Sequence, residues 1–408
     1  APSGSASQVS MSNMAATSVK CNPTGSSAAP QDCTAAQVGS LGIAPAFVNT
    51  FTVNHTIATT DCGGLVQMGT GTTGQLTVTL PSVSGFSGTC PITIRNGDAY
   101  SAGVSRGKIL SGFPAEAYYI LYPKQSLQIA IVNGAWVVIQ PAGRWQQTSV
   151  QLYVSNSGSD TANDCLSTSN PCLRIGTAYA HFGQAIDSQN SQPQINIACG
   201  TYGETVTVQG FNGGASVIFF VGASAARCVN WRNATAAGAT GLLVGDLGIV
   251  EIQNIYFDCS GCTGTNYAIF MHQHAILDIL SGVEFGNFGT GTMIACDSFS
   301  KINMPQLITI SGSAGFFMDF GPSCVAQWGN PSSAVAISNT PTFTNLVRLV
   351  GNATVTMAGL NWTTGTTGIA AGQQWAATGS SFIDQTGVTW PSGSTAGSPA
   401  AGASPYGG

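Results

Sequence analysis

The order of secondary structure in residues 152–221 constrains the fold of this chain more than any other feature. Residues 175–187 carry apolar side chains at i, i+3, i+4, i+7 and i+11, the spacing of one helical face. These residues are Ile175, Ala178, Tyr179, Phe182 and Ile186. A strand-like segment precedes this helix, and two short β-branched and aromatic segments at 205–208 and 217–221 follow it. This order is expected where a β-solenoid begins, with the helix covering the exposed apolar edge of the first coil.

Several motifs in this stretch resemble the N-terminal start of right-handed parallel β-helix proteins of the pectate-lyase and pectin-esterase type. The matching motifs are Tyr153-Val154-Ser155, Gly158-Ser159-Asp160, Asn170-Pro171-Cys172, Ile175, Ala178, and Gly200-Thr201-Tyr202 with Glu204. In that superfamily these are scaffold positions. The resemblance therefore implies an architecture and leaves the activity open.

The remainder of the chain also favours an all-β protein. Short apolar strands followed by Gly, Asn or Asp recur after residue 249, with a period in the range of solenoid repeats. Only 7% of the residues are charged, against roughly 25% in ordinary soluble domains. The net charge of −5 gives no basic surface for a nucleic-acid partner. No run of 18 apolar residues occurs, so we expect no membrane insertion.

We expect four parts along the chain. Residues 1–46 are rich in Ser, Ala, Gly and Pro and read as an extended N-terminal attachment arm. Residues 47–145 form a small β domain, in which Asn133-Gly134 between two apolar runs predicts a hairpin with a type I′ turn. Residues 146–390 form the parallel β-helix, and residues 391–408 a flexible Gly/Ala/Ser/Pro-rich tail or one ordered only in an assembly.

A second resemblance lies in the arm. The run from Asn22 to Pro30, followed by the acidic Asp32, resembles a connecting motif of bacteriophage tail-fibre and side-fibre proteins. Leu80-Pro81 through residue 96, with Trp136, is similar to β domains repeated in the same class. Cys21 and Cys33 depart from the family, where small or apolar residues are expected. The resemblance implies a homotrimer on the virion surface that contacts other virion proteins through the arm.

Twelve cysteines fall into neighbouring pairs, an even count that suits local disulfides. The pairs are 21/33, 62/90, 165/172, 199/228, 259/262 and 296/324. Spacing alone does not prove connectivity. Buried thiols in a solenoid core are an equal alternative for 199, 228, 296 and 324.

Four aspartates are the candidate catalytic residues. Asp258, Asp278, Asp297 and Asp319 are separated by 20, 19 and 22 residues, close to one solenoid turn, so they are predicted to line one face. Carboxylates there would act on a glycosidic bond or bind Ca²⁺. The alternative is that each one follows a strand and satisfies a turn. Cationic partners are scarce and no pectin-esterase motif is present, which favours a binder over an enzyme.

Large aromatic side chains are the candidate glycan-binding residues. They are Trp231, Tyr267, Trp328 and Trp362, with core packing as the alternative for each. Cys259-x-x-Cys262 followed by His272-x-His274 offers four zinc ligands by type, but a disulfide with two stacked or surface histidines is favoured. We therefore predict no metal and no cofactor.

These patterns predict a phage virion fibre or spike protein that binds a host-surface receptor, with a glycan favoured. An enzyme from another class is the first alternative: a polysaccharide depolymerase, either hydrolase or lyase. A purely structural head-fibre or decoration protein is the second.

Overall fold

The computed structural model describes residues 19–21, 31–33, 47–69, 75–98, 108–112, 118–147, 149–184, 186–188, 191–210, 217–224, 227–232, 239–260, 266–328, 334–364, 368–399 and 404–406. The chain divides into two compact units with a boundary between Gly143 and Arg144, close to the predicted boundary at 145. Within the predicted arm, β1 (Val19–Cys21) pairs antiparallel with β2 (Gln31–Cys33). The rest of the arm and the predicted 21/33 disulfide lie outside the described residues.

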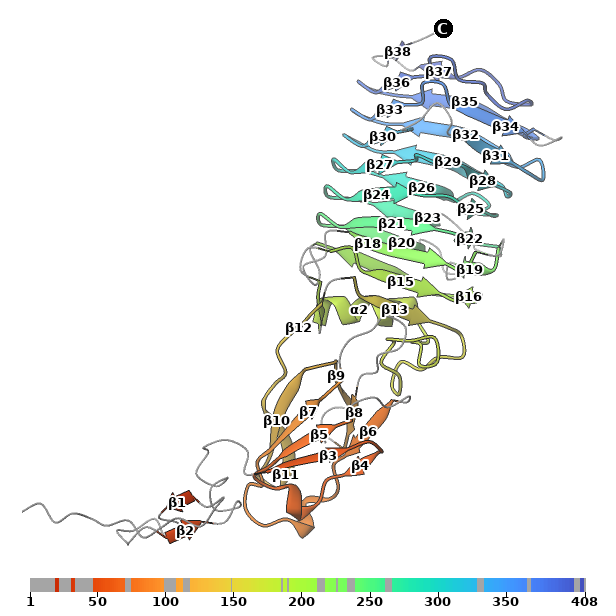
Figure 1. Cartoon of the computed structure of the whole chain (residues 1–408). Helices are drawn as coiled ribbons and strands as arrows, with labels where there is room; N and C mark the ends of the chain where they lie inside the picture. The colour runs from red at the N-terminus through yellow and green to blue at the C-terminus, as the bar shows by residue number, and fades with distance from the viewer. Residues whose placement is uncertain are drawn as a thin grey trace, which may run out of the picture. The chain divides into compact units, whose positions relative to one another are not determined.

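The first unit contains two small mixed sheets (Figure 1). The five-stranded sheet has the order β11 (Ala135–Gln140), β10 (Ser126–Val132), β7 (Ile92–Asn96), β5 (Leu65–Met68) and β3 (Val48–Phe51). The four-stranded sheet has the order β4 (His55–Thr56), β6 (Leu76–Thr79), β8 (Lys108–Ser111) and β9 (Tyr118–Leu121). Two 3₁₀ turns span Thr59–Asp61 and Val83–Gly85.

The predicted hairpin of this unit is confirmed. Strands β10 and β11 pair antiparallel, and Asn133 and Gly134 between them have φ angles of 51° and 76°. Asn and Gly tolerate such positive φ angles, which a type I′ turn requires. The Nε1 of Trp136 donates a hydrogen bond of 2.8 Å to the carbonyl of Pro81, which ties β11 to a loop far away in sequence.

The second unit is a parallel β-helix built from three long sheets, which Figure 1 shows as a stack of successive coils. The ten-stranded sheet consists of β13 (Gln151–Val154), β15 (Gln194–Ile197), β18 (Ile218–Gly222), β21 (Ile249–Gln253), β24 (Ile276–Ile279), β27 (Lys301–Asn303), β30 (Val325–Gln327), β33 (Thr354–Thr356), β36 (Phe382–Asp384) and β38 (Ser404–Tyr406). The seven-stranded sheet consists of β16 (Gly200–Tyr202), β19 (Val229–Arg232), β22 (Tyr256–Asp258), β25 (Glu284–Phe285), β28 (Ile308–Ile310), β31 (Ala334–Ile337) and β34 (Asn361–Thr364). The eight-stranded sheet consists of β17 (Val206–Gln209), β20 (Thr240–Gly245), β23 (Tyr267–Met271), β26 (Thr292–Cys296), β29 (Ala314–Phe320), β32 (Thr342–Leu349), β35 (Ala371–Ala377) and β37 (Ser398–Pro399).

The core of the β-helix consists of apolar residues stacked in register. In the ten-stranded sheet Ile195 pairs with Phe220, Phe220 with Ile252, and Ile252 with Ile279, and all four are buried. The inward side chains at equivalent strand positions therefore stack from coil to coil and fill the interior. The residues used per coil vary, because the loops between strands differ in length.

The predicted helical lid is present as α2 (Ile175–Gln184). All five residues of the predicted apolar face are buried, and α2 packs against β13, β15 and β17 of the first coils. The helix ends earlier than predicted, because Ile186 instead begins β14 (Ile186–Asp187), which pairs with β12 (Trp145–Gln146). Figure 1 shows α2 beside β13 at the start of the coil stack.

The C-terminal segment, predicted as a flexible tail or one ordered only in an assembly, forms two short strands within its described residues. Strand β37 extends the eight-stranded sheet by pairing with β35, and β38 extends the ten-stranded sheet by pairing with β36. A Gly- and Pro-rich sequence can form these last coils because the neighbouring strands supply the backbone hydrogen-bond partners.

Four of the predicted cysteine pairs are confirmed as disulfides. They are Cys62–Cys90, Cys165–Cys172, Cys199–Cys228 and Cys296–Cys324. Cys259 is also disulfide-bonded, and the described residues include no free cysteine. The alternative of buried thiols is therefore wrong for the last two pairs. Each of them joins neighbouring coils of the β-helix.

Candidate functional site

The four candidate aspartates do not line one face. Asp258 ends β22 in the seven-stranded sheet, Asp278 lies on β24 in the ten-stranded sheet, and Asp319 lies on β29 in the eight-stranded sheet. Asp297 follows β26 at a corner. The spacing of the aspartates led to a wrong prediction because it is shorter than one coil. For example, Phe257 pairs with Phe285, 28 residues later in the sequence. A step of about 20 residues therefore moves Asp258 and Asp278 to different sheets, and it leaves Asp297, directly after β26, and Asp319, on the neighbouring strand β29, two positions out of register.

Two of these aspartates make structural hydrogen bonds. Oδ1 of Asp258 accepts bonds from Oγ of Ser260 at 2.8 Å and from the backbone N–H of Asn287 at 3.2 Å. Oδ1 of Asp278 accepts a 2.6 Å bond from the Nδ2 amide of Asn303 in the next coil. Both aspartates therefore agree with the alternative prediction, in which each carboxylate only accepts hydrogen bonds from nearby polar groups.

Asp319 belongs to a more unusual group on the outer face of the eight-stranded sheet. Its two carboxylate oxygens accept hydrogen bonds of 2.7 and 2.5 Å from Nε and an Nη of Arg348, its register partner on β32. The guanidinium carbon of Arg348 lies 4.1 Å from the ring centroid of Phe316. The carboxylate raises the pKa of Arg348, so the cation persists. The fork-shaped pair is held over an aromatic face.

Two further aromatic rings lie on the same sheet, on β23, two strands from β29. Tyr267 and Phe270 on β23 stack with ring centroids 5.2 Å apart and an interplanar angle of 27°. Between β23 and β29 lies β26, whose outward residues Thr292 and Ala295 are small and almost fully buried. The aromatic rings on β23 and β29 therefore extend further from the sheet than the small side chains of β26 between them. We call Tyr267, Phe270, Phe316, Asp319 and Arg348 the aromatic patch.

The aromatic patch combines two kinds of groups suited to polyhydroxylated ligands. Half-buried rings offer apolar faces, while the hydroxyl of Tyr267, the carboxylate of Asp319 and the guanidinium of Arg348 offer fixed hydrogen-bonding groups. Nε and one Nη of Arg348 donate to Asp319, and 41% of the arginine side chain remains exposed.

The three candidate tryptophans lie in the interior. Exposed fractions are 0% for Trp231, 6% for Trp328 and 2% for Trp362, so no ring face is available to a sugar. Trp231 stacks on Phe257 at 5.5 Å and donates its indole N–H to the carbonyl of Glu204 at 3.0 Å. These are core residues, and only Tyr267 of the four candidates belongs to the site.

Sequence reasoning missed two rings of the aromatic patch, Phe270 and Phe316. Phe270 could have been found from its spacing from Tyr267 on the same, otherwise apolar, strand. Phe316 was hidden because it stands next to Phe317, whose ring is fully buried. Only pairing between coils shows which of two adjacent aromatic residues faces outward.

A second polar group lies on the seven-stranded sheet. Arg227 forms an ion pair with Glu284, and its guanidinium carbon lies 5.2 Å from the ring centroid of Tyr256. Burial and the nearby carboxylate of Asp258 raise the pKa of Tyr256 to about 12. At neutral pH the phenol of Tyr256 is therefore protonated. The guanidinium of Arg227 already has an acidic partner, Glu284.

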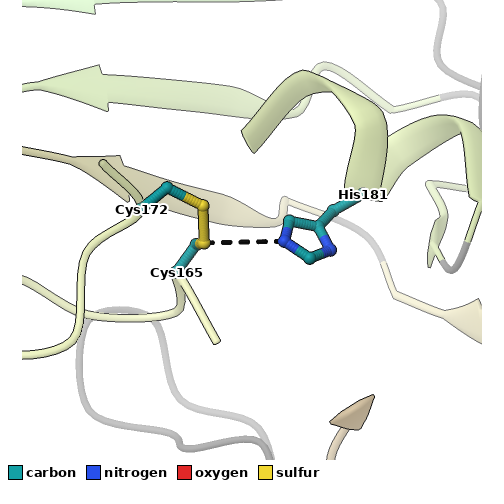
Figure 2. A group of neighbouring side chains, drawn as sticks. All are labelled: Cys165, Cys172 and His181. Atoms are coloured by element: carbon teal, nitrogen blue, oxygen red, sulfur yellow. Dashed lines mark hydrogen bonds between the residues drawn. A yellow bond between two sulfur atoms is a disulfide. The ribbon is translucent and has the colours of Figure 1, made fainter. Parts of the chain in front are cut away.

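The described residues do not support a zinc centre. Cys259 is disulfide-bonded, so it has no thiolate, and His274 stacks on Phe299. Figure 2 shows another sulfur-and-imidazole group, in which Nε2 of His181 lies 3.6 Å from Sγ of Cys165. Both sulfurs there form the Cys165–Cys172 disulfide, and burial lowers the pKa of His181 to about 4. The group is a neutral histidine packed against a disulfide.

No family model, curated protein or solved structure matches this chain. Within the described part of the chain, no helix has the length and apolar character needed to cross a membrane. The fold and the outer face of the β-helix are therefore the basis for any statement about function.

Proposed function

We propose that this protein is a fibre or spike protein of a bacteriophage particle that binds a host-surface glycan through the aromatic patch. One observation carries the binding proposal: stacked rings on β23 and a bidentate Asp319–Arg348 pair on β29 and β32 belong to the same eight-stranded sheet, with β26 between them. Sugars present apolar C–H faces and equatorial hydroxyls, which aromatic faces and fixed hydrogen-bonding groups bind together. The fibre-like motif in the arm, Asn22 to Pro30, supports placement on a virion.

Replacing Tyr267 or Phe316 with alanine is expected to weaken glycan binding at least about tenfold, because each removes one stacking face. Binding is measured on an array of bacterial lipopolysaccharides and capsular polysaccharides, and then by surface plasmon resonance with the best array component. Phe219→Ala is the matched control, since this ring is also half-buried but lies on the ten-stranded sheet. Equal loss in all three variants, or in none, would contradict the assignment of the patch.

We also propose a homotrimer whose N-terminal residues 1–46 contact other virion proteins. The support is the fibre-like motif within the arm. Light scattering of the intact protein at micromolar concentration should give three times the chain mass of 41.5 kDa. A mass of one chain under these conditions would rule the trimer out.

A depolymerase is the second candidate function, favoured by one observation: Asp258 and Glu284 both lie beside Tyr256. Paired carboxylates can act as acid and base on a glycosidic bond. Both carboxylates already have partners: Glu284 forms the ion pair with Arg227, and Asp258 accepts hydrogen bonds from Ser260 and Asn287. The binder is therefore the function that the geometry supports best.

A further inference from the structure

Three successive corner turns, where the eight-stranded sheet leads into the ten-stranded sheet, have an unusual backbone. Each contains two consecutive non-glycine residues with positive φ angles between 48° and 67°. The residues are Asp246 and Leu247, Gln273 and His274, and Ser298 and Phe299. Left-handed backbone is unfavourable for residues with a β-carbon, above all for bulky ones such as leucine and phenylalanine.

The same corner uses glycine in other coils. Gly210, Gly351 and Gly379 also have positive φ angles, and Gly210 directly follows Gln209, the register partner of Gly245 before Asp246. Glycine adopts this conformation without strain. Two consecutive left-handed residues with side chains therefore carry a backbone cost at these three corners that glycine would avoid, and strained backbone of this kind concentrates at functional sites.

The strained turns are fixed by hydrogen bonds between coils. The backbone N–H of Leu247 donates to the carbonyl of Gln273 at 3.0 Å, and that of His274 donates to the carbonyl of Ser298 at 3.0 Å. The second residues of the three turns consequently stack along the β-helix. We call Leu247, His274 and Phe299 the corner column.

The corner column exposes apolar and aromatic surface. Leu247 is 49% exposed and Phe299 is 65% exposed. The imidazole of His274 stacks on the Phe299 ring with centroids 5.3 Å apart and planes inclined by 9°. Asp246, Leu247, Gln273 and His274 line an open hollow of about 520 Å³. This volume lies in the range of small-ligand sites.

We propose that the corner column and its hollow form a second glycan subsite, which extends the aromatic patch. This inference rests on the proposed function. The two surfaces are continuous along the chain, because Phe270 of the patch lies 5.8 Å from the ring of His272, which immediately precedes Gln273 and His274. A glycan held by the patch reaches the corner by following this segment.

The lining of the hollow indicates which sugars fit. Leu247 and the paired rings of His274 and Phe299 offer apolar faces, while the carboxylate of Asp246 can accept and the amide of Gln273 can both donate and accept hydrogen bonds with sugar hydroxyl groups. A sugar carrying its own carboxylate is repelled by Asp246, because like charges at short range are unfavourable. The subsite therefore takes a neutral or amino sugar, in preference to a uronic or sialic acid.

The test uses the double variant Leu247→Gly with Phe299→Gly in the full-length protein. Glycine removes the side chains and relieves the strained backbone, so the Tm should stay unchanged or rise by about 1–3 °C. Binding of fragments of five or more sugars, released from the best component of the polysaccharide array, should fall about tenfold. Binding of two-sugar fragments should stay the same, because the patch alone holds them.

Ser298→Gly is the matched control, because it relaxes the same corner and leaves the corner column intact; it should not change binding. Unchanged binding of long fragments by the double variant, while Tyr267→Ala still weakens binding, would overturn the second subsite and leave the proposed function standing. A Tm lowered by several degrees would show that the side chains are structural and would also overturn it. If the wild-type protein binds no array component, the proposed function and this subsite fail together.

Discussion

Replacing Phe182 with aspartate is expected to destabilise the β-helix by at least about 3–5 kcal/mol, the usual effect of losing a buried phenylalanine ring. The side chain is fully buried where α2 covers the first coils. An uncompensated carboxylate in that position adds a desolvation penalty to the lost packing. The lid should therefore open and expose apolar strand edges, with aggregation as the visible result.

Urea unfolding and solubility of the purified protein measure this effect. Ala180→Asp places the same charge on the opposite side of α2, where the residue is only partly buried, and should cost about 0.5 kcal/mol through helix propensity. If Phe182→Asp were as stable and soluble as Ala180→Asp, α2 would not be the lid of the β-helix.

Replacing Glu204 with alanine is expected to cost about 2–4 kcal/mol, because two hydrogen bonds to a charged group are lost. Its carboxylate oxygens accept bonds of 2.7 and 2.9 Å from the backbone N–H groups of Ile175 and Gly176, the first residues of α2. Glu204→Gln keeps one acceptor oxygen and should cost less. Equal stability of the alanine variant and the wild type would show that the carboxylate does not hold the helix.

Glu204 also makes the free energy of unfolding depend on pH. Burial raises the pKa of Glu204 above its ordinary value of 4.5, although the two backbone hydrogen bonds oppose this shift. The folded state then binds the proton more tightly than the unfolded state. This contribution to stability is present below pH 4.5 and is lost as the pH rises through the raised pKa. Unfolding free energies measured across this window should show that contribution in the wild type and lack it in Glu204→Gln.

The start of the β-helix could be predicted from sequence because its signals are local. The apolar face of α2 depends on helical spacing within one segment; four of the five predicted residues lie in α2, Ile186 begins β14, and all five are buried. The motif residue Glu204, matched only by resemblance, also has a clear physical role at the N-terminus of α2. Four cysteine pairs followed from proximity in sequence, since two disulfides join adjacent coils of the β-helix 28 or 29 residues apart, Cys165–Cys172 lies within one loop, and Cys62–Cys90 in the first unit also spans 28 residues.

The candidate site could not be predicted in the same way, because it depends on how coils align. Asp319 and Arg348 meet only because their strands pair in register across one coil, 29 residues apart. Trp231 and Trp362 looked like surface aromatics in a polar chain, yet the alternation of their strands turns both inward. The positive φ angles of Leu247 and Phe299 leave no mark in the sequence at all.

The most direct test of the central claim measures binding and cleavage in one sample. The intact protein is incubated with the bacterial lipopolysaccharides and capsular polysaccharides of the array, and both retained protein and new reducing ends or unsaturated sugars are measured. We predict saturable binding to at least one polysaccharide, loss of that binding in Tyr267→Ala, and no cleavage products. Absence of binding, or cleavage that a single substitution among Asp258→Asn, Asp278→Asn, Asp297→Asn and Asp319→Asn abolishes while binding persists, would contradict the account.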